Sequence, residues 1–549
     1  MTNYINLKVT GTPVTTQAFG GNHVARFATV TYQVTDQATF EVDVVSGNVD
    51  PSQTDSVPII LGSDGSRTLT TLTYLTYPGT TEQSTHVFRA QVPLSMGLNT
   101  LTINAIDFTD TLEVTRVSSL TTVTVTDSAA ARAAIKSAGE TVDSSVNEII
   151  LDYDETNFNT MFAGVASLNL CRGSNRKTWL TITSPVGKTA QHHMDTTTGT
   201  AILCRSGLTR YSLKGITLGS STSRVDAGSI YQETGCDLWA QDCTVTAKYT
   251  LDYTSADSGR INEGLTGPGI GYNAVADANY ISVFRSEITG YTTDGVLYYG
   301  KVFMTGCTLT GIIWPAGGMV MQRDCIHVDC RHDATNGTLV MLNVLVDGAV
   351  PMVVPNRTDH FHCDINQFWG TGQKPGSTEW NNIYMAGVKL IEDPARTADN
   401  TADGILKKNG TAFGLYGDKS YQTKMTNMII RDCSIATSKQ TGTNYMQNAG
   451  IITNALFENL TFYTDNSSLL CRANWPNPSY EEQFAPTNVH YKNMRISAYS
   501  FFSTANGNRS VTGGAGDQTV AIQTAADLSF PPANTMTFHA PNYTTPLYL

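Results

Sequence analysis

The chain has 549 residues, of which 40% are hydrophobic and 15% are charged, and its formal net charge is -12 at pH 7. That length allows several ordinary domains, or one long repeat structure with an appended domain. The acidic balance, without any dense basic run, argues against a nucleic-acid partner. No apolar run approaches the roughly 18 residues that a membrane span requires, and residues 1–7 lack the basic and apolar regions of a secretion signal. We therefore expect a protein made in the cytoplasm without a signal peptide.

Three of the ten cysteines share one local pattern. Cys243, Cys307 and Cys433 each follow Asp or Gly and precede Thr or Ser and then an aliphatic residue. A cysteine that recurs at one position of a repeat is most simply a small buried residue. We therefore expect free core thiols rather than disulfides, which fits a reducing compartment.

Residues 1–126 are predicted to form a separate all-β domain. Seven β-branched runs are separated by turn residues, at Ala25–Val34, Thr39–Val45, Ser56–Leu61, Arg67–Thr76, His86–Val92, Asn99–Ile106 and Ser119–Thr126. This number and spacing of short strands is typical of a sandwich. The stretch from Met96 to Asp107 is similar to the closing strands of bacterial immunoglobulin-like modules. That resemblance implies a spacer or docking domain.

Residues 127–152 are expected to link this domain to the next and to cap it. Residues 128–139 predict a short helix, with Ser or Asp capping its start and Gly ending it. The strand Glu148–Asp152 follows. A short alanine-rich helix before an Ile-Ile-Leu strand resembles the N-terminal cap of pectate-lyase-like β-helices. Such a cap is needed because an open solenoid end exposes core and unpaired strand edges.

Residues 153–499 are predicted to form a right-handed parallel β-helix. Short alternating segments recur at intervals of about 18 to 45 residues, and three of them follow closely at Cys325–Asp329, Asn343–Asp347 and His360–Asp364. A repeat near 20 residues with Asn, Gly and Asp at the corners is typical of this fold. Residues 500–549 lose the pattern and are left as a C-terminal cap, an oligomer contact or a tail.

The three segments end in Asp329, Asp347 and Asp364, which lie 18 and then 17 residues apart. If the register holds, they form a column with rungs about 4.8 Å apart. Stacked like charges repel, so such a column needs a cation, a proton or a substrate beside it. The plain alternative is that Asp, Asn and Gly only mark the corners of the coil.

Two kinds of polysaccharide cleavage fit such a column. Carboxyls about 5 Å apart suit a retaining glycosidase and carboxyls roughly 6.5 to 9.5 Å apart an inverting one; Asp347 with Asp364 fits the first spacing and Asp329 with Asp364 the second. A lyase would use carboxylate-bound Ca²⁺ and a basic side chain. The nearby candidates for that role are His327, Arg331, His332 and His362.

The sequence from Asp359 to Trp369 resembles a stretch of right-handed β-helix proteins of the pectate-lyase-like superfamily, which includes phage proteins. The resemblance adds His360 and Gln367 as substrate-binding candidates. Aromatic rings stack on sugar faces, which adds Trp314, Trp369 and Trp380. The same rings would otherwise only cover rungs beneath loops.

These features favour a phage virion surface protein resembling a tailspike, which binds host surface polysaccharide; whether it also cleaves the polysaccharide stays open. Tailspike resemblance implies a homotrimer, and an N-terminal domain that contacts other virion proteins. Two alternatives stay open: a structural virion decoration or fibre protein without catalysis, and a bacterial polysaccharide lyase or glycosidase exported by another route.

Overall fold

A computed structural model describes much of the chain. The described residues are 7–9, 25–29, 33–47, 59–62, 65–68, 70–72, 75–76, 83–84, 87–105, 108–141, 144–154, 168–170, 180–185, 191–192, 202–204, 209–219, 230–232, 236–246, 270–271, 280–289, 301–312, 317–330, 336–349, 366–367, 379–391, 413–415, 424–437, 446–448, 451–458, 460–464, 487–492, 494–496 and 520–522.

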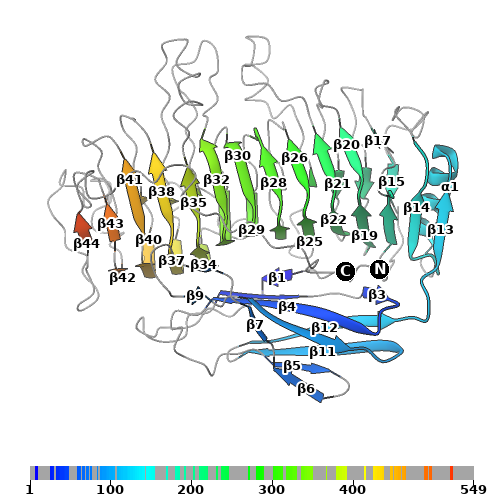
Figure 1. The fold of residues 1–549 in the computed structure, drawn as a ribbon, viewed down its shortest axis with the longest axis horizontal. Coiled ribbons are helices and arrows are strands. Elements are labelled where there is room, and N and C mark those ends of the chain that lie inside the picture. The colour runs from blue at the N-terminus through cyan, green and yellow to red at the C-terminus, as the bar shows by residue number, and fades with distance from the viewer. Residues whose placement is uncertain are drawn as a thin grey trace, which may run out of the picture.

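The N-terminal part forms two five-stranded sheets (Figure 1). The first runs in the order β1 (Leu7–Val9), β2 (Ala25–Thr29), β4 (Thr39–Gly47), β10 (Val87–Pro93), β7 (Thr70–Leu72). The second runs β3 (Gln33–Thr35), β12 (Phe108–Arg116), β11 (Gly97–Ala105), β5 (Ile59–Gly62), β6 (Gly65–Thr68), and β8 (Leu75–Thr76) pairs β9 (Gln83–Ser84). Every pair is antiparallel except β12 with β3. The two layers touch through β12 and β2, and Val92, Leu101 and Val114 are fully buried. The immunoglobulin-like assignment stays a prediction.

The rest of the described chain is a parallel β-helix, which confirms the all-β solenoid. Its strands form three parallel sheets, here called sheets 1, 2 and 3. Sheet 1 contains β13 (Thr122–Val125), β14 (Glu148–Leu151), β16 (Leu180–Thr183), β19 (Thr209–Lys214), β22 (Cys236–Gln241), β25 (Tyr280–Phe284), β27 (Lys301–Thr305), β29 (Gly317–Arg323), β31 (Asn336–Leu342), β34 (Glu379–Ala386), β37 (Lys424–Arg431), β40 (Ile451–Glu458) and β42 (Thr487–Lys492), with β33 (Asn366–Gln367), β36 (Phe413–Leu415) and β39 (Met446–Asn448) joined through β31.

Sheets 2 and 3 complete the coil. Sheet 2 contains β17 (Gln191–His192), β20 (Thr217–Gly219), β23 (Thr244–Thr246), β26 (Glu287–Thr289), β28 (Thr308–Thr310), β30 (Ile326–Cys330), β32 (Leu345–Ala349), β35 (Lys389–Ile391), β38 (Ser434–Thr437), β41 (Thr461–Thr464), β43 (Met494–Ile496) and β44 (Val520–Ile522). Sheet 3 contains β15 (Leu168–Leu170), β18 (Ile202–Cys204), β21 (Ile230–Gln232) and β24 (Ile270–Gly271).

Two strands lie on the other side of the expected boundaries. Thr122–Val125 pairs in parallel with β14, so it opens the solenoid rather than closing the sandwich. Val520–Ile522 pairs in parallel with β43, so the solenoid continues past residue 499. Both segments are short β-branched runs, and such runs do not reveal which sheet they join.

The predicted capping helix is α1 (Ser128–Glu140). Asp127 is its N-cap, and its Oδ1 accepts a hydrogen bond from the N–H of Ala130 at 2.8 Å. The expected glycine end is wrong, because the helix runs through Gly139 and ends at an extended Thr141. Ala131, Ile135 and Ala138 are buried, and the helix contacts the first strands of the solenoid. This arrangement closes the end of the core.

Eight of the described rungs turn from sheet 1 to sheet 2 through one residue in the left-handed conformation, here called the corner residue. The corner residues are Gly215, Asp242, Arg285, Gly306, Asp324, Asn343, Gly387 and Asp432. The N–H groups of the first seven donate to the last sheet 1 carbonyl of the next rung, as from Gly215 to Gln241 at 2.9 Å and from Asp242 to Phe284 at 3.0 Å. The first residue of the sheet 2 strand donates back to the preceding rung, as from Thr244 to Ile216 at 3.0 Å. Backbone hydrogen bonds therefore lock successive corners together.

The outer face of sheet 1 is covered. Its side chains that point away from the core are nevertheless buried, including Ser212, Trp239, Phe284, Arg323, Leu342 and Tyr384. Strand β1 contacts β27, and β2 contacts β34. Figure 1 shows the N-terminal sheets along this side of the solenoid. The N-terminal part thus shields one face of the coil.

Gly215 gives a direct test of the corner. Its φ is +64°, and a Cβ placed there would lie 2.9 Å from the backbone oxygen of Ser184. We expect Gly215→Ala to lower stability by about 2 kcal/mol or more, because strain and a backbone clash add. Gly97 is the matched control, with φ +92° and open space around it, so Gly97→Ala should cost roughly 1 kcal/mol. Equal shifts in the urea midpoints of the two variants would contradict this account of the corner.

Candidate functional site

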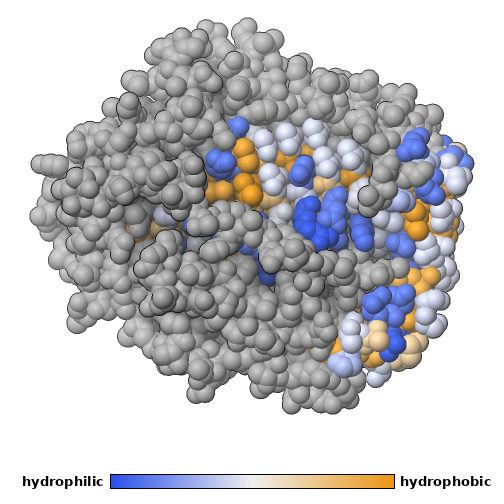
Figure 2. Space-filling model, in the orientation of Figure 1, coloured by the Kyte–Doolittle hydropathy of each residue, from blue (hydrophilic) through white to orange (hydrophobic). Residues whose placement is uncertain are grey.

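The outer face of sheet 2 is more open than that of sheet 1. The column of sheet 2 that faces the core contains Val245, Ile288, Leu309 and Val346, which are all buried. The side chains on either side of that column are half-exposed in β23, β28, β30 and β32, as is Thr217 in β20. Figure 2 shows a band of weakly polar and hydrophobic residues in view where Figure 1 draws β26 to β32. This face differs from that of sheet 1 in remaining accessible.

The predicted register of the aspartate column is wrong. Asp347 lies opposite Val328 on one side and Ile391 on the other, so it does not stack on Asp329. The physical reason is the length of the rung, which is 19 residues from Val328 to Asp347, one more than the aspartate spacing. Asp329 has φ +51° and is itself a bend residue, as the corner alternative proposed. Asp364 lies outside the described residues.

His327 does not face outward, contrary to the prediction. It occupies the inner column of sheet 2 between Leu309 and Val346, and it is fully buried. Its Nε2 lies 2.6 Å from Oε1 of the fully buried Gln322, so the neutral ring donates to that oxygen. Burial lowers the pKa of His327 to about 3. A histidine in this position cannot reach a polymer outside the solenoid.

Gln322 and His327 are polar residues between apolar neighbours in their columns. The neighbours of Gln322 in sheet 1 are Met304 and Met341. Neither Gln322 Nε2 nor His327 Nδ1 has a hydrogen-bond partner among the described residues. Such a half-satisfied pair costs stability relative to an apolar core.

The other candidate residues divide into two groups. Trp380 is buried, with 3% of its surface exposed, because β34 belongs to the covered sheet 1; it does not line an open sugar groove. Gln367 lies in β33, where only its backbone is described. The remaining candidates lie outside the described residues: Arg331, His332, His360, His362, Asp364, Trp314 and Trp369. Their roles stay predictions.

Lys389 joins Asp347 on the outer side of sheet 2. Asp347 lies opposite Ile391, so Lys389 is two residues away along the adjacent strand and on the same face. Asp347 is half-exposed, whereas Lys389 is 6% exposed and its pKa is lowered by desolvation. A lysine with a lowered pKa is a candidate general base, and a carboxylate on the same face is a second group of the kind that polysaccharide cleavage uses. The sequence analysis missed Lys389 because a 44-residue rung separates it from Asp347.

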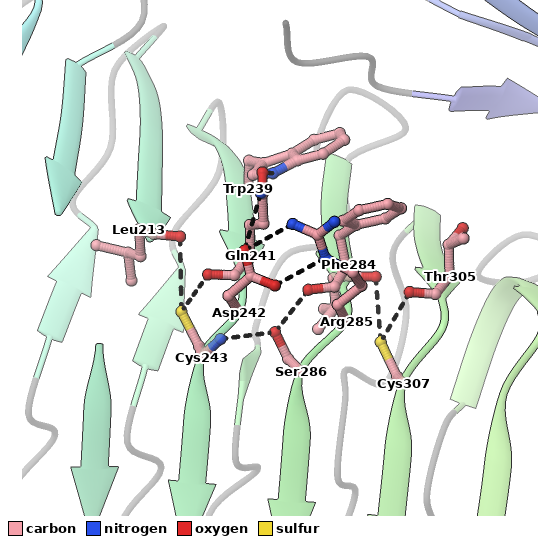
Figure 3. A network of polar contacts seen from close by, with 11 residues as sticks. Leu213, Trp239, Gln241, Asp242, Cys243, Phe284, Arg285, Ser286, Thr305 and Cys307 are labelled. Carbon is pink, nitrogen blue, oxygen red and sulfur yellow. Dashed lines mark hydrogen bonds and ion pairs between the residues drawn. The ribbon is translucent and has the colours of Figure 1, made fainter. Parts of the chain in front are cut away.

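A polar network joins two successive rungs at the corner (Figure 3). Arg285 donates to Asp242 through Nε and a terminal nitrogen, at 2.7 and 2.8 Å. Its guanidinium lies 4.8 Å from the centre of the Phe284 ring. Gln241 links Asp242 to Trp239, accepting from the indole at 3.4 Å. Because each member is tied to its neighbours within the chain, we assign this network to holding the corner rather than to binding a ligand.

The recurring cysteines occupy the position just inside the corner, which confirms the free buried thiols. Cys243, Cys307, Cys325 and Cys433 are all free and buried. Each Sγ donates to the carbonyl two residues earlier, as from Cys243 to Gln241 at 3.3 Å. Ser286 occupies the same position and makes the same bond to Phe284 at 2.9 Å. Burial raises the pKa of Cys243 to about 12, so its thiol is unreactive in the folded chain.

Within the part of the chain that the structure describes, no three His, Cys, Asp or Glu side chains gather as a metal site requires. The Ca²⁺ role stays a prediction, because several candidate residues lie elsewhere. The described helix is too short and too polar to cross a membrane.

Comparison with known proteins adds little to this geometry. No protein-family model matches the chain, and no curated protein matches it. Among solved structures, the chain is similar to the catalytic unit of a thermostable GH87 alpha-1,3-glucanase from Streptomyces thermodiastaticus strain HF3-3. The sequence identity is 13%, the match covers 86% of this chain and 87% of that chain, and the TM-score is 0.25. A TM-score that low carries no inference about fold or function.

The buried Gln322–His327 pair predicts a pH-dependent stability. An unfolded histidine takes up a proton below its ordinary pKa of 6.5, whereas folded His327 stays neutral down to about pH 3. The folded chain therefore loses stability as the pH falls from 6.5 to 3. The double substitution Gln322→Met/His327→Leu restores both apolar columns. Its stability advantage over wild type should be roughly 3 kcal/mol larger at pH 4 than at pH 7.

Urea unfolding at the two pH values measures this difference. The single variant His327→Leu is the control, because it removes the titration but leaves Gln322 Oε1 without its donor. His327→Leu should lose the pH dependence as the double variant does, but its free energy of unfolding should be lower than that of the double variant at both pH values. A double variant with the pH dependence of wild type would show that His327 is not the group responsible.

Proposed function

We propose that this chain is a virion surface protein resembling a tailspike, which binds host surface polysaccharide along its β-helix. The observation that carries the proposal is the contrast between the two long faces of the coil. Sheet 1 is covered on its outside, whereas sheet 2 leaves half-exposed side chains on β20, β23, β28, β30 and β32. The face from β20 to β32 spans roughly 24 Å at the usual strand spacing. A straight, rigid surface of that length suits an extended polymer.

Cleavage of the bound polymer is the stronger form of this proposal. Asp347 is the half-exposed carboxylate on the open face, and Lys389 lies beside it on the next rung. Asp347 would act on the polymer from the open face, beside Lys389 on the next rung. The proposed spike is a homotrimer, and its N-terminal sheets are proposed to contact other virion proteins.

A second candidate is a structural virion protein that binds or projects without catalysis. The register of Asp347 favours it, because Val328 and Ile391 rather than other carboxylates flank this residue. A lone carboxylate cannot perform the two-carboxyl chemistry of a glycosidase. A second acid from outside the described residues, such as Asp364, would be needed.

A depolymerisation assay separates these candidates. Purified protein is incubated with a panel of acidic and neutral bacterial polysaccharides, and new reducing ends and the absorbance of unsaturated products are followed. We expect cleavage, and at least a hundredfold slower cleavage by Asp347→Asn because a general acid or base contributes about that much. Asp154→Asn, an exposed carboxylate near the cap, is the control and should match wild type.

The outcomes divide the candidates cleanly. Binding without cleavage by folded wild type would leave the structural virion protein and remove Asp347 from catalysis. Unsaturated products would indicate elimination, and reducing ends without them would indicate hydrolysis. If folded wild type neither binds nor cleaves any polysaccharide in the panel, the proposed function is overturned.

A further inference from the structure

Threonines are arranged in two columns on the open face of sheet 2. One column contains Thr217, Thr244 and Thr308, with Glu287 between the last two, and the other contains Thr246, Thr289 and Thr310. All six threonine side chains are half-exposed. We call these six residues the threonine array. They come from four successive strands, β20, β23, β26 and β28.

The array has the repeat and the rigidity of a preformed binding surface. Neighbouring rungs place equivalent side chains about 4.8 Å apart along the solenoid axis. Threonine is β-branched and therefore restricted at χ1, so little side-chain entropy is lost when a ligand binds. Each side chain offers one hydroxyl donor, two acceptor lone pairs and a methyl group. A repeating ligand with hydroxyls and C–H faces fits such a surface.

The composition of the array disfavours the other partners that a sheet face can take. The array itself is uncharged and the residue between Thr244 and Thr308 is the exposed, acidic Glu287, so these columns offer no cation for nucleic acid or for an acidic polymer. Protein interface cores are enriched in aromatic residues, Met and Arg, and threonine seldom dominates their binding energy. The array contains none of the enriched types. A second copy of the chain is therefore a poorer occupant than a sugar polymer.

The array also leads toward Asp347. The column that contains Thr308 continues on the next two strands with Ile326 and Leu345. The column that contains Thr310 continues with Val328 and then Asp347. The side chains of Ile326, Val328 and Leu345 are half-exposed, and they offer an apolar surface on which a sugar ring can pack. Thr310 lies two rungs from Asp347, or about 9.6 Å along the axis. A chain that lies along the columns reaches the carboxylate.

We propose that the threonine array is a binding subsite for an uncharged stretch of polysaccharide, which lies along the solenoid axis with its hydroxyls on the threonine hydroxyls. This inference rests on the proposed polysaccharide binding and specifies which part of the polymer is held and where. The array binds the polysaccharide, and the aliphatic residues Ile326, Val328 and Leu345 support the part of the polymer that lies between the array and Asp347.

The test removes the hydroxyls and keeps the shape. Thr289→Val/Thr308→Val/Thr310→Val retains β-branching and loses three hydroxyls, and Thr→Ser at the same positions retains the hydroxyls and loses the methyl groups. Binding is measured by calorimetry with the neutral polysaccharide that wild type binds best in the panel. We expect the valine variant to bind at least tenfold more weakly and the serine variant to keep most of the affinity. Thr124→Val, at an exposed threonine of β13, is the control and should bind as wild type does.

Each result decides between the array and the broader function. Unchanged binding by the folded valine variant would overturn the array and leave polysaccharide binding intact. The array would also be overturned if wild type bound only acidic polysaccharides and the valine changes did not weaken that binding. Failure of wild type to bind any polysaccharide would remove the proposed function itself. A change of oligomeric state in the valine variant, seen by light scattering, would make the array a contact between copies of the chain and would overturn the subsite.

Discussion

The hydrogen bonds at the corner between sheets 1 and 2 fix the stacking of the solenoid. The corner residue donates its N–H to the next rung, and the first residue of the sheet 2 strand donates back to the preceding one. These bonds use backbone atoms only, so Gly, Asp, Asn and Arg can all occupy the corner. A left-handed conformation costs about 1 kcal/mol for most residues other than glycine, and the bidentate Arg285–Asp242 pair holds the bulkiest of them in place. Constant backbone geometry thus permits a variable sequence.

The position just inside the corner is buried. It holds Cys243, Ser286 and Cys307 in three rungs and the aliphatic residues Ile216, Val344 and Val388 in three others. Where it is cysteine or serine, the side chain donates to the carbonyl two residues earlier. The recurrence of cysteine therefore reflects packing and a local hydrogen bond rather than redox chemistry. The raised thiol pKa values agree with that explanation.

The sequence supported the architecture better than it supported the site. Alternation, the recurring cysteines and the Asp127 cap predicted the solenoid, the buried thiols and the helix, since each depends on a local pattern. The predicted aspartate column was wrong because the register of the strands depends on the length of each rung, and the rung from Val328 to Asp347 is one residue longer than the spacing of Asp329 and Asp347. The predicted role of His327 was wrong because a shift of one residue in a strand exchanges its inner and outer faces. Lys389 was hidden because a long insertion separates it in sequence from the strand that it joins.

The failure of the aspartate column changes where function should be sought. A solenoid has several long faces, and each can serve only if nothing covers it. The N-terminal sheets lie along sheet 1, so aromatic residues there, such as Trp239 and Tyr384, belong to an internal contact. Sheet 2 has no such cover over β23 and β28, and its outer residues there are threonines rather than charges. A face that is rigid, carries few charges and is rich in hydroxyls binds by many weak hydrogen bonds. Its affinity therefore grows with the length of polymer held, and a long polymer is the ligand it suits best.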